Sequence, residues 1–281
     1  MIRLAVRVAR EQSEQVLAEL IDLAPSGVEE TDVSDRVVEY AVYGAPGELP
    51  ALPDLETAAG GALVEISTSE IADDWSQRWR EFHRPLVLGD RLSVRPPWEP
   101  PTATALDIVI DPGRAFGTGA HATTRLCLEL LLELPQTSAP AGGSGPAVVD
   151  LGCGSGVLGI AAARLGWRPV LALDNDPLSV EAAITNAAVN AVAEFVEVRR
   201  FDLRRDAVPP ARLVLANLLA PLLRDWCAAL RSGAGSIPAM VIASGLLVEE
   251  ADAIAGAFAD LGLCERDRRT RGDWAALLAT R

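Results

Sequence analysis

Alternating apolar and polar residues characterise the first seventy positions of the chain, where short strand patterns flank two helical ones. Residues 2–8 alternate in the manner of a half-buried strand, whereas residues 11–23 place their apolar positions on one helical face. The same patterns recur up to residue 68, with expected strands at 2–8, 28–33, 37–43 and 63–68 and expected helices at 11–23 and 52–59. This βαββαβ order predicts a small ferredoxin-like α+β domain over residues 1–70.

A tryptophan-rich segment follows this domain. Trp75, Trp79 and Phe82 are spaced as on one face of a helix, a pattern that usually indicates core packing and less often a ligand contact. An extended, proline-containing passage comes next. We therefore expect residues 71–104 to form a linker with a Trp-rich helix.

Short apolar strands alternate with helical patterns from residue 105 onward. Expected strands lie at 106–110, 147–151, 170–173, 196–200, 213–216 and 240–244, and expected helices at 123–134, 158–165, 180–192 and 220–230. Such alternation is typical of a doubly wound, mostly parallel sheet. Residues 105–281 are thus predicted to form an α/β catalytic domain.

A glycine-rich turn ends the second of these strands. Gly152, Gly154 and Gly156 follow the buried strand directly, and glycine there allows a ligand to approach the backbone closely. Asp150 precedes the turn, and Asp174 ends the next strand, where a carboxylate can accept both ribose hydroxyls. An acid before the turn disfavours a pyrophosphate but suits a cofactor with an ammonium group. The pattern therefore favours S-adenosylmethionine over a simple turn without a ligand.

Two further segments carry polar groups at places where ligands bind. Residues 111–124 combine three glycines and three threonines around Phe116, which suggests a loop that closes over a ligand. Thr123 and Thr124 could instead cap the helix that they begin. Asn217 ends a buried strand within an apolar run, where its amide could cap the next helix or hold a nucleophile or cofactor.

Composition narrows the possible functions. The 281 residues carry a formal charge of −14, and all 25 basic residues are arginine. The absence of lysine excludes a Schiff-base lysine, a Walker-type phosphate loop and a lysine general base. The acidity argues against general binding to nucleic acid or anionic membranes and would suit a basic partner, although it could equally serve solubility alone.

Cysteine and histidine usage argues against a metal site. The four cysteines form no CxxC pair, and His83 and His121 are the only histidines. The N-terminal pattern does not predict a signal peptide, and no apolar stretch is long enough to predict a transmembrane helix. We therefore expect a cytoplasmic protein, and a monomer.

Several short motifs accompany the segments described above. They are DWxxxW at 74–79, PGxAFGTGxHxTT at 112–124, DLGCGSGxL at 150–158, DNDP at 174–177, N-x-x-x-N at 186–190, ANLLAPL at 216–222, SGLL at 244–247 and W-x-x-L at 274–277. In these motifs the chain resembles the PrmA family, bacterial methyltransferases that modify a large-subunit ribosomal protein. The resemblance spans nearly the whole chain. It implies a class I S-adenosylmethionine-dependent fold behind a small domain that grips the ribosomal protein.

The resemblance also implies roles for individual residues. Matching motif positions give cofactor contacts at Phe116, Thr124, Gly152, Gly154, Asp174 and Asn217. Asn217 is the expected catalytic residue, which orients the nucleophile or the cofactor. The expected reaction moves methyl groups to lysine side chains and an N-terminal amine. A lysine amine must first lose its proton, and an apolar pocket or, alternatively, His121 as a base would allow this.

Three other functions stay open at this point. The chain could methylate lysines of a non-ribosomal protein, since related enzymes share the catalytic core. It could be a nicotinamide oxidoreductase, although Asp150 and the lack of a third dinucleotide-type glycine, where Val157 stands, argue against this. It could also sense the cofactor or assist assembly without catalysis, a function that the presence of Asp174 and Asn217 disfavours.

Overall fold

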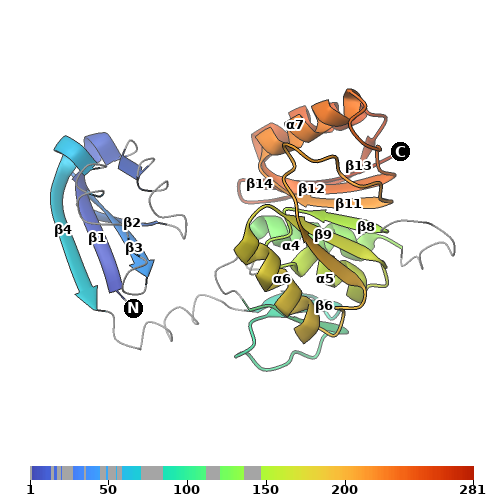
Figure 1. Ribbon diagram of the computed structural model, residues 1–281, viewed down its shortest axis with the longest axis horizontal. Coiled ribbons are helices and arrows are strands. Elements are labelled where there is room, and N and C mark those ends of the chain that lie inside the picture. Colours follow the sequence, from blue (N-terminus) through green and yellow to red (C-terminus); the bar gives the residue numbers. More distant parts are fainter. Residues whose placement is uncertain are drawn as a thin grey trace. The chain divides into compact units, whose positions relative to one another are not determined.

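The computed structural model describes residues 2–13, 16–17, 20, 28–34, 36–44, 49, 55, 59–70, 85–111, 121–135 and 147–281. The chain divides into two compact units, Met1–Phe82 and His83–Arg281, and each contains a sheet (Figure 1). Each unit also has a hydrophobic core of its own. None of the helices described is long and apolar enough to span a membrane.

The N-terminal unit is built on a four-stranded antiparallel sheet. Its strands are β1 (Ile2–Ala9), β2 (Glu29–Ser34), β3 (Val37–Gly44) and β4 (Leu63–Glu70). Their spatial order is β2-β3-β1-β4, with antiparallel pairing throughout. All four expected strands are therefore confirmed, and their order is that of the ferredoxin-like fold, with the first and third strands in the centre.

One face of this sheet is apolar and the other is polar. Leu4, Val6 and Val8 of β1 are buried in one cluster with Val16, Leu20 and Leu55, which come from the two expected helical segments. Alternate positions of β1 carry Arg3 and Arg7, which both pair with the carboxylate of Glu39 on β3. This alternation is what a sheet covered on one face requires. The expected helices 11–23 and 52–59 lie largely outside the described residues.

The second unit contains a seven-stranded sheet of order β10-β9-β8-β11-β12-β14-β13. The strands are β8 (Val148–Leu151), β9 (Val170–Asp174), β10 (Val196–Arg200), β11 (Leu213–Asn217), β12 (Met240–Leu247), β13 (Cys264–Arg271) and β14 (Trp274–Thr280). The five strands from β10 to β12 are parallel, and β14 is antiparallel to both of its neighbours. The chain runs outward from β8 to β10 and then resumes at β11 on the other side of β8.

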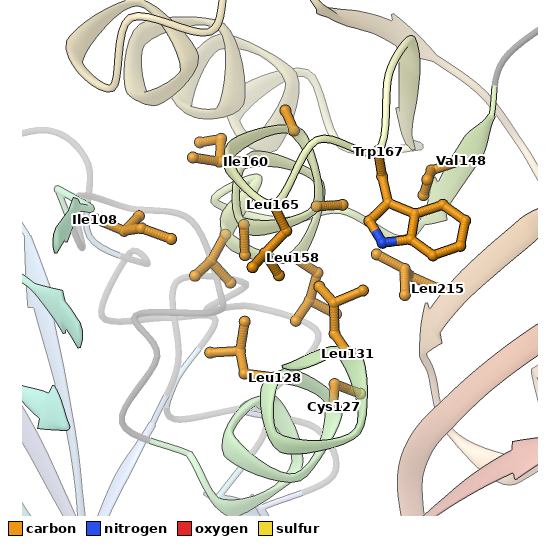
Figure 2. Packing of buried hydrophobic residues seen from close by; sticks show 14 of the residues in the cluster. Ile108, Cys127, Leu128, Leu131, Val148, Leu158, Ile160, Leu165, Trp167 and Leu215 are labelled. Atoms are coloured by element: carbon orange, nitrogen blue, oxygen red, sulfur yellow. The ribbon is translucent and has the colours of Figure 1, made fainter. Parts of the chain in front are cut away.

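Two hydrophobic cores cover opposite faces of this sheet. Val148 and Leu215 face the core formed with α4, α5 and α6, whereas Val149 and Leu151 face the core formed with α7 and α8. The helices are α4 (Ala122–Glu133), α5 (Val157–Arg164), α6 (Pro177–Val189), α7 (Ala220–Arg231) and α8 (Ala251–Ala259). Figure 2 shows the first core, where Trp167 lies beside Val148 and Leu215. Burial on both faces explains why these strands are continuous apolar runs.

A separate three-stranded sheet corrects one sequence expectation. Strand β7 (Leu106–Val109) was expected to begin the doubly wound sheet, but it pairs instead with β6 (Leu92–Arg95), which pairs with β5 (Leu86–Leu88). The described part of the expected linker 71–104 thus contains two strands. Ser93 and Arg95 on β6 bind the carboxylate of Asp107 on β7, a partly buried polar contact that links the two strands. The expected Trp-rich helix lies outside the described residues.

Candidate active site

The candidate site lies between β8 and β11, where the order of the strands in the large sheet reverses. Strands β8 and β11 are parallel neighbours, and they lead to opposite halves of the sheet. In doubly wound sheets this position opens a crevice at the carboxyl ends of the strands. The expected site residues follow β8 (Gly152 and Gly154) or end β9 and β11 (Asp174 and Asn217), so the fold brings these four to one edge.

The glycine turn after β8 has a backbone that needs glycine. Gly152, Gly154 and Gly156 all have positive φ, at 66°, 51° and 81°. A Cβ atom on Gly152 would lie 2.5 Å from Cδ2 of Leu218, the residue after Asn217. The backbone N–H groups of Gly152 and Cys153 both donate to the carbonyl of Leu173 on β9, at 2.8 and 3.0 Å. The turn is therefore held tightly between the ends of β9 and β11.

Asp174 links the end of β9 to the same turn. Its Oδ2 accepts a hydrogen bond from the Gly154 N–H at 2.8 Å, and its Oδ1 accepts one from the Asp176 N–H at 3.0 Å. The side chain is partly exposed. Because a carboxylate offers about four lone-pair sites, two backbone donors leave it able to accept further hydrogen bonds.

Asp150 is buried beneath the turn. Only 1% of its surface is exposed, and its Oδ2 accepts a hydrogen bond from the Gly159 N–H of α5 at 2.8 Å. Its Oδ1 has no hydrogen-bond partner among the described residues. Burial raises the pKa of Asp150 to about 7, and the charge of Asp174 acts in the same direction against the lowering effect of the Gly159 N–H.

Asn217 and Thr124 contact each other at the switch point, which is the position between β8 and β11 where the strand order reverses. The Asn217 Nδ2 donates to the Thr124 Oγ1 at 3.3 Å, and Thr124 is fully buried near the start of α4. The sequence placed both residues in the site without indicating that they touch. Their contact connects α4 to the end of β11, which lies directly beside the glycine turn.

Gly245 is a positioning element that the sequence reasoning did not single out. It lies in β12 where the pairing with β14 shifts register, and its φ is 81°. A Cβ atom there would lie 2.5 Å from the Leu218 carbonyl oxygen, and the Leu218 N–H donates to the Ser244 carbonyl at 3.0 Å. The residues after Asn217 therefore lie directly against β12. The sequence signal for Gly245 was the SGLL motif at residues 244–247, which was noted only as part of the family resemblance.

His121 caps α4. Its Nδ1 accepts from the Thr123 N–H at 3.4 Å and lies 2.8 Å from the Thr123 Oγ1. Its ring packs edge-to-face on Trp274 at the start of β14, with 5.0 Å between centroids. The structure thus assigns a capping and packing contact to the residue that the sequence offered as an alternative base. Phe116, the remaining expected cofactor residue, lies outside the described residues.

Known proteins are similar to this chain over most of its length. The family described as "Ribosomal protein L11 methyltransferase (PrmA)" matches residues 1–281. The protein named ribosomal protein L11 methyltransferase from Heliobacterium modesticaldum is 40% identical over 252 residues, which are 88% of this chain and 76% of that protein. The one from Pelotomaculum thermopropionicum is 41% identical over 78% of this chain and 70% of its own length.

The chain belongs to the ribosomal protein L11 methyltransferase (PrmA) family.

A crystal structure agrees with this membership. The ribosomal protein L11 methylase of Lactobacillus delbrueckii subsp. bulgaricus is 30% identical, with a TM-score of 0.59, over 71% of this chain and 99% of that one. The expected fold, a class I S-adenosylmethionine-dependent methyltransferase behind a small antiparallel sheet domain, is confirmed. The chain is an S-adenosylmethionine-dependent protein methyltransferase.

The described residues of the site suit S-adenosylmethionine. The unpartnered Oδ1 of Asp150 is a buried acceptor beside the glycine turn, and such atoms are rare without a reason. Asp174 retains acceptor capacity at the end of β9, where a ribose is bound in related folds. Around these atoms, the His, Cys, Asp and Glu side chains within the described ranges form no group that could hold a metal ion.

Proposed function

We propose that this chain transfers methyl groups from S-adenosylmethionine to amino groups of ribosomal protein L11, on lysine side chains and on the N-terminal amine. The observation that carries the proposal is the contact of Asn217 with Thr124 beside the glycine turn, in a chain that belongs to the L11 methyltransferase family. The relatives named above are called ribosomal protein L11 methyltransferases, which makes L11 the first substrate to test.

The residues at the switch point would each bind a different part of the cofactor or line the crevice. Asp174 would accept hydrogen bonds from the ribose, and Gly152 and Gly154 would let the ligand reach the backbone. Thr124 and Asn217 would line the opposite side of the crevice. When bound, S-adenosylmethionine supplies an electrophilic methyl group.

Asn217 is the proposed catalytic residue. Its side-chain amide is fixed at one end by Thr124, which leaves its carbonyl oxygen available to accept a hydrogen bond from an amine N–H and so to orient the amine. Holding two reacting groups in line can contribute roughly 7–11 kcal/mol to a barrier. The amine must be neutral to react, and because a free lysine has a pKa of about 10.4, its transfer into an apolar pocket helps to remove the proton.

The N-terminal unit is the proposed substrate-recognition domain, over residues 1–70. Its sheet presents a polar face in which Glu39 is shared by Arg3 and Arg7. The net charge of the whole chain, −14, would favour binding to a basic ribosomal protein, free or on the large subunit. We further propose that the enzyme acts as a monomer in the cytoplasm and makes no direct contact with nucleic acid.

A competition experiment tests the choice of substrate. A mixture of unmethylated large-subunit proteins is incubated with the full-length enzyme and methyl-labelled S-adenosylmethionine, and the labelled amines are mapped by peptide mass spectrometry. Label on lysines and the N-terminal amine of L11 alone is the expected result. Label spread over other proteins, or on no protein when the cofactor binds, would refute L11 as the substrate.

A further inference from the structure

We propose that Asn186 on α6 is a positioning residue for cofactor binding, because its side chain joins the glycine turn to the backbone that follows β7. In the described part of the chain, the Asn186 side chain forms no hydrogen bond with Gly152, Gly154, Asp174 or Asn217. It acts instead through the backbone groups that it binds, at Ser155 and Asp111. The inference rests on the proposed placement of S-adenosylmethionine at the glycine turn and is independent of which protein is methylated.

The Asn186 side chain makes two hydrogen bonds to distant parts of the chain. Its Nδ2 donates to the carbonyl of Ser155, inside the glycine turn, at 2.9 Å. Its Oδ1 accepts from the N–H of Asp111 at 3.1 Å. Asn186 is only 2% exposed and Ser155 is fully buried. A buried amide with both ends engaged fixes the relative position of the two backbones that it binds.

Close packing of α6 on the glycine turn makes this contact possible. A Cβ atom on Gly156 would lie 3.0 Å from the Cβ of Ala183, one helical turn before Asn186. Glycine at one position and alanine at the other therefore let the helix approach the turn. At this separation a side chain as short as asparagine reaches the Ser155 carbonyl.

The glycine turn that Asn186 binds carries proposed cofactor residues. Ser155 follows Gly154, whose N–H binds Asp174. A shift of the turn relative to α6 would therefore move Gly154 and change its hydrogen bond to Asp174. Loss of this bridge should weaken cofactor binding more than an equal loss of stability elsewhere.

Asn190, one turn further along α6, provides a matched control. It is 3% exposed and also binds backbone: its Oδ1 accepts from the Val109 N–H at 2.9 Å, and its Nδ2 donates to the Val109 carbonyl at 2.6 Å. The remaining hydrogen bond of its Nδ2 goes to the Asn186 carbonyl at 2.8 Å rather than to the glycine turn. The two asparagines thus differ chiefly in the bond to Ser155.

The test compares Asn186→Ala with Asn190→Ala in the full chain. Affinity for S-adenosylmethionine is measured by calorimetry well below the unfolding temperature of each variant. We expect both to unfold at lower temperature, Asn186→Ala to bind the cofactor about tenfold more weakly, and Asn190→Ala to bind it within about twofold of the wild type. Equal affinities of the two variants, with wild-type binding intact, would overturn the inference and leave the proposed function standing.

A second variant changes the group that faces the glycine turn. Asn186→Asp keeps the size of the side chain and an acceptor for the Asp111 N–H, but it replaces the amide donor with a carboxylate oxygen that repels the Ser155 carbonyl. We expect weaker cofactor binding and a raised KM for S-adenosylmethionine, with a smaller change in the KM for the protein substrate. An unchanged KM for the cofactor in this variant would also overturn the inference. Absence of binding by the wild type would instead refute the proposed cofactor site.

Discussion

Asn217, at the end of β11, donates a hydrogen bond to the buried hydroxyl of Thr124 on α4, over a distance of 3.3 Å. The contact joins two residues that lie far apart in the sequence, and Leu218, the residue after Asn217, lies against the glycine turn. It also fixes one half of the Asn217 amide. The proposed chemistry depends on this pair, because the other half of the amide must hold a nucleophile or cofactor in one orientation.

Removal of the Asn217 amide should slow the reaction more than it destabilises the fold. We expect Asn217→Ala to lower kcat by about 100-fold, the effect of misplacing a reacting group by roughly 1 Å. Loss of one partly buried hydrogen bond should reduce the free energy of unfolding by only about 1 kcal/mol. Steady-state kinetics and urea denaturation measure the two effects. A variant with unchanged kcat would remove Asn217 from the mechanism.

Asp174 should contribute to cofactor affinity. We expect Asp174→Asn to weaken S-adenosylmethionine binding by about 10- to 100-fold, the range for losing charge-assisted hydrogen bonds. Asp260 serves as the control, because it forms an exposed pair with Arg231 at 3.1 Å, close to the ends of α8 and α7. Asp260→Asn should change neither affinity nor stability by much. Calorimetry measures both affinities, and equal values for the two variants would be incompatible with a ribose contact by Asp174.

Gly245 should tolerate a methyl group poorly. In Gly245→Ala the new Cβ would lie against the Leu218 carbonyl oxygen, which is 2.5 Å away. Gly262 offers a matched control, with a similar φ of 76° and no described neighbour within 4 Å of the place that a new Cβ would take. Both variants carry the left-handed strain of about 1–2 kcal/mol, and overpacking should add about 1–3 kcal/mol in Gly245→Ala alone.

The activity of these two glycine variants should differ as well. Displacement of Leu218 would move Asn217, so we expect kcat to fall in Gly245→Ala and to stay near the wild-type value in Gly262→Ala. Thermal unfolding and initial rates provide the measurements. Similar losses in both variants would show that β12 does not position the end of β11.

The buried carboxyl of Asp150 should make stability depend on pH. Burial raises its folded pKa to about 7, whereas an aspartate in the unfolded chain ionises near about 3.9. Between these values the folded state retains a proton that the unfolded state releases. The contribution of this group to stability is therefore present at low pH and is lost as the pH rises through about 7, by roughly 4 kcal/mol at most.

Asp150→Asn should abolish this dependence. The variant should gain stability relative to the wild type as the pH rises from about 5 to about 8, in urea denaturation without cofactor. Its amide can keep an oxygen toward the Gly159 N–H, so the main bond of the wild type is retained. A constant difference in stability across this pH range would contradict a raised pKa at Asp150.

The sequence predicted many of the strands and helices that are buried on one or both sides. Runs such as Val148–Leu151 and Leu213–Asn217 are apolar because both faces of these strands are covered, and alternation in Ile2–Ala9 follows from a sheet with one polar face. The strands β13 and β14 were not predicted. Strand β13 reads CERDRRTR and lies at the edge of the sheet, where charged residues protect against pairing with another chain and erase the apolar pattern.

The site was predictable as a set of residues but not as a set of contacts. The carboxyl ends of three strands carry Gly152, Asp174 and Asn217. Their position at one edge of the sheet follows from the fold class. The bonds of Asn186 to Ser155 and Asp111 depend on how closely α6 packs on the turn. That separation is set by tertiary packing, which periodicity does not encode.

Intact-protein mass spectrometry of isolated, unmethylated ribosomal protein L11 is the decisive experiment for the proposed methyl transfer. L11 is incubated with S-adenosylmethionine and either the wild-type enzyme or Asn217→Ala, after calorimetry has shown that each binds the cofactor. We predict successive mass increments of one methyl group each with the wild type, and almost none with the variant in the same time. Equal methylation by both would contradict the role of Asn217, and an unmodified L11 with the wild type would contradict the proposed function.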